Sequence, residues 1–200
     1  MIDGRRLEEG LTGPTLQDML VDLLHNRLGG QRILREVFIN GQPYAQDTMG
    51  PASSLPRENI SSLKVDTMDA VDVARQFLKT GPDFLEPIIE SAAKVAELFR
   101  VADEKEANEH YLNYLESLQS FLQILDASRH ALNLDFKDYK LEGLSAEKRL
   151  ERISDLFQEL LDAQKERDWV LLADILQYDL VPELRAWQGF LTKLAQEQGV

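Results

Sequence analysis

The sequence predicts an α+β protein that is mostly α: a small helix-plus-two/three-strand unit in residues 1–67, packed with an antiparallel helical bundle of about five helices in residues 68–200. Two observations carry this prediction. Before about residue 67, helix-like, strand-like and loop-like segments alternate, whereas almost everything after it has apolar residues at helical spacing. The composition, 44% hydrophobic and 28% charged, is typical of a globular protein and argues against a disordered chain.

The N-terminal unit begins with an amphipathic helix. Pro14 and Thr15 precede apolar residues spaced by three and four, and Gly29-Gly30 ends the pattern. The following segment, residues 33–39, is rich in branched and aromatic side chains and predicts a strand. Asn40-Gly41 then favours a type I′ hairpin turn, because both central residues of that turn need a positive φ.

The returning arm of this hairpin contains Pro43, which confines it to the edge of a sheet or keeps it short. Residues 47–59 have the composition of a loop, and residues 60–67 predict another strand. One helix on two or three strands makes a thin core, so we expect this unit to lean on the rest of the chain.

Five helices are expected after residue 67. The first covers 69–79 and stops at Thr80-Gly81, and the second opens at Pro82. The third and fourth helices are recognised by apolar residues at intervals of mostly three and four. In the third helix these are Tyr111, Leu115, Leu118, Leu122 and Leu125. In the fourth they are Leu150, Ile153, Phe157, Leu160 and Leu161.

An interruption at residues 134–145 separates these two helices, and the last helix runs from 168 to 196. Pro182 falls inside the last helix. Because proline lacks an N–H and its ring crowds the carbonyl four residues before it, we expect a bend near residues 178–182.

Several classes of chemistry are excluded or disfavoured. The chain has no cysteine, which rules out disulfides, thiolate zinc sites and cysteine nucleophiles. It also has none of the short motifs typical of nucleophile-elbow hydrolases, zinc proteases, P-loop enzymes or dinucleotide-binding folds. We therefore expect no enzyme activity and no cofactor.

The charge of the chain argues against nucleic acid as a partner. Lys and Arg number 22 against 35 Asp and Glu, so the formal net charge is −13, and phosphate backbones are repelled unless a local basic patch overrides that field. Arg27, Arg32, Arg35 and Arg57 come nearest to such a patch. The first ten residues lack the apolar run of a secretory signal, and no segment approaches the roughly 20 apolar residues that cross a bilayer. A cytoplasmic protein without membrane contact is expected.

Carboxylate-bridged metal sites deserve a test in any acidic bundle. They need Glu-x-x-His on two helices plus a Glu from each of two others. Neither His110 nor His130 follows a Glu by three, and the two lie 20 residues apart on one expected helix. No metal ligand is therefore assigned.

Four residues of the last helix are the candidate interaction or structural polar residues. Asp174 and Asp179 lie within an apolar run on either side of Tyr178, where one of them is expected to be partly buried and to accept a hydrogen bond from a tyrosine or an arginine across the bundle. Trp187 is expected in the core, although an exposed tryptophan would indicate a partner surface. A structural role is favoured over a catalytic one for the two acids.

Two segments resemble the sequence pattern of a known protein family. They are Val37-Phe-Ile-Asn-Gly41 and the stretch from Ala173 through Pro182 to Trp187. The chain is similar to an uncharacterised family of bacterial proteins that pair a small α+β unit with an acidic helical bundle. One departure is Gln177, where the pattern has an acid before Tyr178. The resemblance implies an architecture and no activity.

These observations favour a non-enzymatic cytoplasmic protein that binds a protein partner, as an adaptor or as an export chaperone that presents a groove to a client helix. Two alternatives stay open. One is a metal-binding or enzymatic helical bundle that uses carboxylates. The other is a structural homodimer whose bundle is completed by the second subunit.

Overall fold

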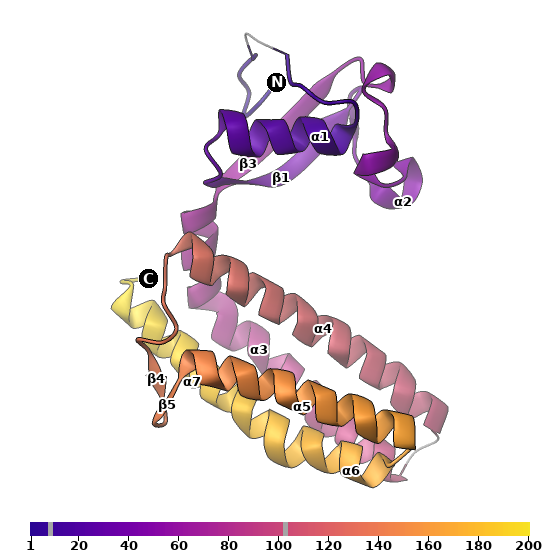
Figure 1. The fold of residues 1–200 in the computed structure, drawn as a ribbon, viewed down its shortest axis with the longest axis vertical. Helices are drawn as coiled ribbons and strands as arrows, with labels where there is room; N and C mark the ends of the chain where they lie inside the picture. Colours follow the sequence, from indigo (N-terminus) through magenta and orange to yellow (C-terminus); the bar gives the residue numbers. More distant parts are fainter. Residues whose placement is uncertain (8–9, 102–103) are drawn as a thin grey trace. The chain divides into compact units, whose positions relative to one another are not determined.

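The computed structural model describes residues 1–7, 10–101 and 104–200. The chain divides into two units, Met1–Val73 and Ala74–Val200. The boundary predicted from the sequence, between residues 67 and 68, falls inside strand β3 (Leu63–Asp69). The predicted fold class is confirmed, since one unit is built on a small sheet and the other is helical (Figure 1).

The N-terminal unit places helix α1 (Leu16–Val21) across a three-stranded antiparallel sheet of order β2-β1-β3 (Figure 1). Thr15 caps α1 in a capping box with Asp18, and the helix continues as a π-helix, η1 (Asp22–Arg27). Its apolar face covers the sheet, so Leu16, Leu23 and Val65 are fully buried. These side chains form the thin core expected of so short a unit.

The hairpin predicted at Asn40-Gly41 is confirmed. Strand β1 (Arg32–Ile39) pairs with the two-residue edge strand β2 (Gln42–Pro43), with Ile39 opposite Gln42. Both turn residues have a positive φ, +54° at Asn40 and +84° at Gly41. On its other side β1 pairs with β3, with a bulge between Leu34 and Glu36. Arg32 lies opposite Asp69 at one end of this pairing, and Ile39 lies opposite Leu63 at the other.

The predicted loop at residues 47–59 contains short helical turns. These are α2 (Gln46–Met49), η2 (Ala52–Ser54) and η3 (Arg57–Asn59). Its end packs beside α1, where Leu16 N donates to Leu55 O at 2.9 Å.

The helical unit consists of four antiparallel rods that lie side by side (Figure 1). They are α3 (Ala70–Val101), which begins in the N-terminal unit, α4 (Glu104–Ala131), α5 (Ala146–Glu166), and the continuous series α6 (Trp169–Asp174), η4 (Ile175–Leu180) and α7 (Val181–Glu197). The fully buried core side chains include Leu85, Tyr111, Phe121, Leu160 and Trp187.

The expected break between the first two helices of the bundle is wrong. Residues 70–101 form one helix that passes through Gly81, Pro82 and Pro87. Gly81 is buried, and a Cβ there would lie 3.1 Å from Leu191 Cδ1, so the glycine lets α3 approach α7 closely. Gln188 of α7 also donates to Pro82 O at 3.0 Å. Packing against α7 therefore outweighs the local stop signal.

Pro182 is accommodated by a π-helix just before it. The structure forms η4 over Ile175–Leu180, and Pro182 occupies the first turn of α7, where a missing N–H costs little. The interruption before α5 holds a hairpin that the sequence did not indicate. Strands β4 (Lys140–Leu141) and β5 (Leu144–Ser145) pair there across a turn at Glu142 and Gly143, both with positive φ. No helix of the described residues is both long and apolar enough to cross a membrane.

Candidate binding groove between α4 and α5

An open groove runs between α4 and α5 in the helical unit. Its larger part has a volume of about 550 Å³ and is lined by Tyr111, Leu115, Gln119, Leu122, Gln123, Asp126, Phe157 and Leu161. A smaller cavity of about 260 Å³ shares three of these side chains and adds Leu125, Leu150, Ile153 and Ser154. The two cavities therefore form one continuous, largely apolar depression.

The walls of the groove come from two matched rows of side chains. On α4 the row is Leu115, Gln119, Leu122 and Asp126, and on α5 it is Leu150, Ser154, Phe157 and Leu161. Both rows have spacings of four, three and four, which place all members of a row on one helix face. Each helix thus carries a second stripe beside the one that enters the core.

The floor of the groove is closed and uncharged. Tyr111 is 1% exposed and stacks on the neighbouring ring of Tyr114. Burial raises the pKa of the Tyr111 hydroxyl to about 12, so it stays neutral at physiological pH. The upper part is open to solvent, since Leu161 is 46% exposed and Leu112, one turn from Leu115, is 57% exposed.

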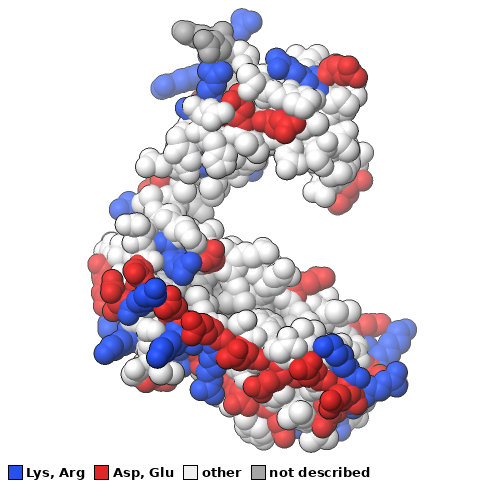
Figure 2. Space-filling view, viewed as in Figure 1, with Lys and Arg blue, Asp and Glu red and all other residues white. Residues whose placement is uncertain are grey.

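The two helices that form the groove carry a net negative charge. In sequence, α4 carries five acidic and two basic side chains, and α5 carries six acidic and four basic ones, of which Arg149 is buried. Asp126 lies on the groove itself and pairs with Arg129 at 3.0 Å. Figure 2 shows acidic side chains along α5, beside a largely uncharged surface towards α4.

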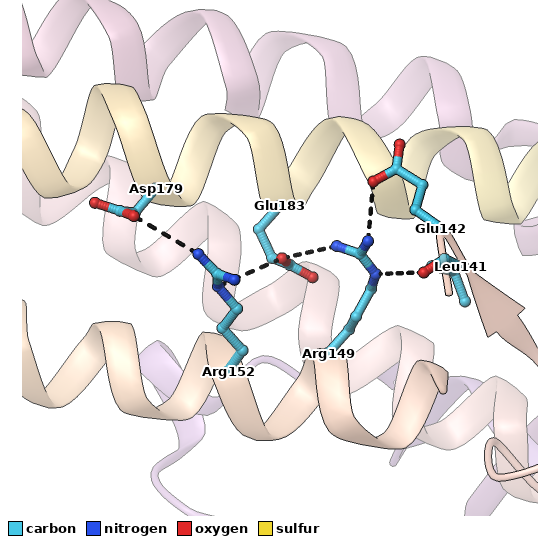
Figure 3. A network of polar contacts seen from close by, with 6 residues as sticks. All are labelled: Leu141, Glu142, Arg149, Arg152, Asp179 and Glu183. Carbon is cyan, nitrogen blue, oxygen red and sulfur yellow. Dashed lines mark hydrogen bonds and ion pairs between the residues drawn. The ribbon is translucent and has the colours of Figure 1, made fainter. Parts of the chain in front are cut away.

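A polar network centred on the buried pair Arg149 and Glu183 holds the α5 wall in place (Figure 3). Arg149 of α5 donates from Nε to Leu141 O at 3.0 Å, from Nη1 to Glu183 Oε2 of α7 at 2.9 Å and from Nη2 to Glu142 Oε2 at 2.9 Å. Arg152, one turn further along α5, lies 3.8 Å from the same carboxylate of Glu183. The network therefore ties α5 to both α7 and the β4–β5 hairpin.

Family models match the chain in two parts. The model of a domain of unknown function, DUF8042, matches residues 76–190, and that of another domain of unknown function, DUF8043, matches residues 1–68. The chain belongs to the DUF8042 family. All residues of the groove and of the polar network lie within the DUF8042 match. No curated protein and no solved structure matches the chain.

The DUF8042 domain separates the four residues singled out in the sequence. Asp174 accepts from Arg100 Nη2 of α3 at 2.6 Å. From the sequence, either Asp174 or Asp179 was expected to accept such a bond, from a tyrosine or from an arginine. Tyr178 is 64% exposed, with the Arg100 guanidinium 5.7 Å from its ring centre. These two residues share one surface cluster on Arg100, and they line none of the cavities described above.

Asp179 and Trp187 have different surroundings. Asp179 lies 3.7 Å from Arg152 at the outer end of the polar network (Figure 3). Trp187 is fully buried in the DUF8042 domain, with ring centres 5.7 Å from Phe136 and 5.5 Å from Phe190. It belongs to the core and presents no surface to a partner.

Apolar periodicity places five residues in the helix stripes of the bundle but does not separate core from surface: Leu115, Leu122, Leu150, Phe157 and Leu161. The structure places them at the edge of the core, where they line the groove. The sequence did contain a signal for the groove. On each of the two helices, the residues at helical spacing cover a wider face than a single core stripe requires. Which of two adjacent stripes stays open depends on where the neighbouring helices pack.

The histidines do not converge. His110 and His130 both lie on the uninterrupted helix α4, about 30 Å apart along its axis. Within the described part of the chain, no three His, Asp or Glu side chains gather closely enough to hold a metal ion.

Proposed function

We propose that this protein is a non-enzymatic, cytoplasmic bacterial protein that binds a basic amphipathic helix of a partner protein in the α4–α5 groove. The observation that carries the proposal is the open groove between the two rows, five of whose eight side chains are apolar, on helices that carry a net negative charge. A helix laid in such a groove would bury Leu, Ile or Phe at helical spacing between the rows. An adaptor or chaperone works in this way.

The negative charge of α4 and α5 favours a partner helix with basic flanks. Lys and Arg on the flanks of the bound helix would face the acidic side chains of α4 and α5, which favours association and disfavours acidic competitors. A second copy of this chain would instead bring two acidic surfaces together. The partner is therefore a different, locally basic protein.

Two synthetic helical peptides test this proposal. Both carry the same leucine face, and their other positions are lysine in one and glutamate in the other. Fluorescence anisotropy at moderate salt is expected to show saturable binding of the lysine peptide and at least tenfold weaker binding of the glutamate peptide. Equal binding of the two would contradict the charge argument, and no binding of either would contradict the docking site.

A matched pair of variants locates the binding. Leu161 and Leu171 are each 46% exposed, but only Leu161 lines the groove. Leu161→Ser is expected to weaken the lysine peptide about tenfold, because one apolar anchor contributes about 1.5 kcal/mol, whereas Leu171→Ser stays within twofold of wild type. Equal effects would show that the peptide binds elsewhere.

The two alternatives have their own readouts. A dimer in sedimentation that Leu161→Ser dissociates would mean that a second copy fills the groove. Near-stoichiometric iron, manganese or zinc after gentle purification would favour the metal-binding or enzymatic bundle.

A further inference from the structure

The N-terminal unit contains a pocket lined by four arginines. It has a volume of about 630 Å³, and Arg5, Arg6, Arg27 and Arg32 all contribute to its wall. Arg5 and Arg6 are exposed, whereas the Arg27 and Arg32 side chains are about one-third exposed. The chain has a net charge of −13, so this cluster of guanidinium groups is a locally basic site on an acidic protein.

Arg32 is held in a defined orientation. Its Nε donates to Thr67 Oγ1 at 2.8 Å, and its Nη2 donates to Thr67 O at 3.1 Å and Asp3 Oδ2 at 3.0 Å. These bonds join strands β1 and β3 to the N-terminal residues. A guanidinium fixed in this way loses little further side-chain entropy when it binds a ligand.

Asp3 is the acidic side chain among the described residues of the pocket wall, and its oxygens are already occupied. Oδ1 accepts from Thr67 N at 2.6 Å, and Oδ2 accepts from Thr67 Oγ1 at 2.7 Å as well as from Arg32. Outside the lining, Asp22 lies 3.9 Å from Arg27 Nε. Counted over these described residues alone, the four arginines outnumber the two acids by two.

We propose that this pocket binds a small phosphate-bearing molecule. Guanidinium groups recognise phosphate oxygens with paired hydrogen bonds, and two or more converging arginines suit a group with two negative charges. The volume falls within the range of small-molecule sites, about 300–1,000 Å³. Ile2, Leu7 and Leu28 add an apolar part to the wall. The site therefore has room for an organic portion beside the phosphate.

Isothermal titration of the full chain with pyrophosphate and with ATP, without divalent metal, tests this site. Saturable one-to-one binding of at least one probe is expected. Arg5→Gln should weaken it at least fivefold, and Arg5→Gln/Arg6→Gln at least twentyfold. Arg35→Gln is the matched control, since Arg35 is an exposed arginine of the same unit that does not line the pocket. It should change affinity less than twofold.

Three results would overturn the proposal: no saturable binding of either probe, an equal loss in Arg35→Gln, or binding of a single-stranded oligonucleotide only. The last would indicate a nucleic-acid surface in place of a small-molecule site. Leu161→Ser should leave probe binding unchanged, so failure here is independent of failure at the groove.

Discussion

Arg149 and Glu183 form an ion pair in the interior of the helical unit, with Nη1 2.9 Å from Oε2 and side chains that are 8% and 3% exposed. The pair joins α5 to α7. Among the described residues, Glu183 Oε1 has no hydrogen-bond partner. The protein therefore stabilises the buried Glu183 carboxylate mainly through the contacts of Oε2.

Removal of one charge from this pair should be costly. Glu183→Gln leaves the Arg149 guanidinium buried without its main counter-charge, and we expect a loss of about 3 kcal/mol in the free energy of unfolding. The double variant Arg149→Met/Glu183→Leu should lose less than Glu183→Gln alone, because neither buried charge remains. Urea unfolding followed by tryptophan fluorescence measures this, since Trp169 and Trp187 both lie in the helical unit.

Glu159→Gln serves as the control for that series. Glu159 is an exposed acid on α5, the helix that carries Arg149. Its substitution should change the unfolding free energy by less than about 0.5 kcal/mol. A Glu183→Gln effect of that same size would show that the pair does not stabilise the fold.

Two glycines of the N-terminal unit should differ sharply when changed to alanine. At Gly13, φ is +120° and a Cβ would lie 2.4 Å from Asp18 Cβ and 3.0 Å from the Asp18 backbone carbon. At Gly41, φ is +84° but the space is open. Gly13→Ala should cost about 3 kcal/mol or more, through strain and overlap with the capping box, and Gly41→Ala about 1 kcal/mol.

Amide hydrogen exchange in β1 and β3 measures this difference for the N-terminal unit alone. Similar protection in the two variants would mean that α1 can shift to make room at Gly13.

Asp3 should make the N-terminal unit sensitive to acid. The backbone N–H of Thr67, followed by the Thr67 hydroxyl and Arg32, holds the pKa of the Asp3 carboxyl below its usual value of 3.8. A lowered folded-state pKa stabilises the fold above the unfolded-state pKa, and this contribution disappears as pH falls through the folded-state pKa. Asp3→Asn should therefore be less stable than wild type at pH 7, and the difference should shrink as the pH is lowered to 2.

Urea titration followed by two-dimensional NMR of the N-terminal unit checks this at both pH values. Asp47→Asn, at an exposed position in α2, is the control. A wild-type advantage over Asp3→Asn that is as large at pH 2 as at pH 7 would show that the Asp3 charge is not its source.

The residues singled out in the last helix should have unequal effects on stability. Trp187→Ala removes a fully buried ring and should cost about 3–5 kcal/mol. Asp174→Asn weakens a surface ion pair with Arg100 and should cost no more than about 1 kcal/mol. Far-UV circular dichroism during urea unfolding compares the two. A small effect at Trp187 would contradict its place in the core.

Local signals predicted the N-terminal hairpin well. Asn40-Gly41 needs no distant contact to form its turn, since both residues tolerate positive φ, and Pro43 can only be placed where its missing N–H is not needed. The β4–β5 turn uses the same conformations at Glu142-Gly143. Glutamate rarely adopts a positive φ, so the sequence carried no comparable signal there.

The stop expected at Gly81-Pro82 shows the opposite case. Glycine and proline weaken a helix locally, but the buried glycine brings α3 against Leu191 of α7, and this contact lies far away in sequence. Similarly, Asp174 meets Arg100 from 74 residues away, although nothing near Asp174 indicates which arginine it pairs with.

The sequence by itself determined the α+β class, the N-terminal hairpin and the helical character of the chain after β3, because apolar periodicity and turn residues act over a few residues. It determined neither the continuity of α3 nor the β4–β5 hairpin. Only the tertiary structure decided which apolar stripe of α4 and α5 is buried and which lines a groove, and which arginines line one pocket with Asp3. Those outcomes depend on how distant segments pack, since a stripe is a core face only where another element covers it.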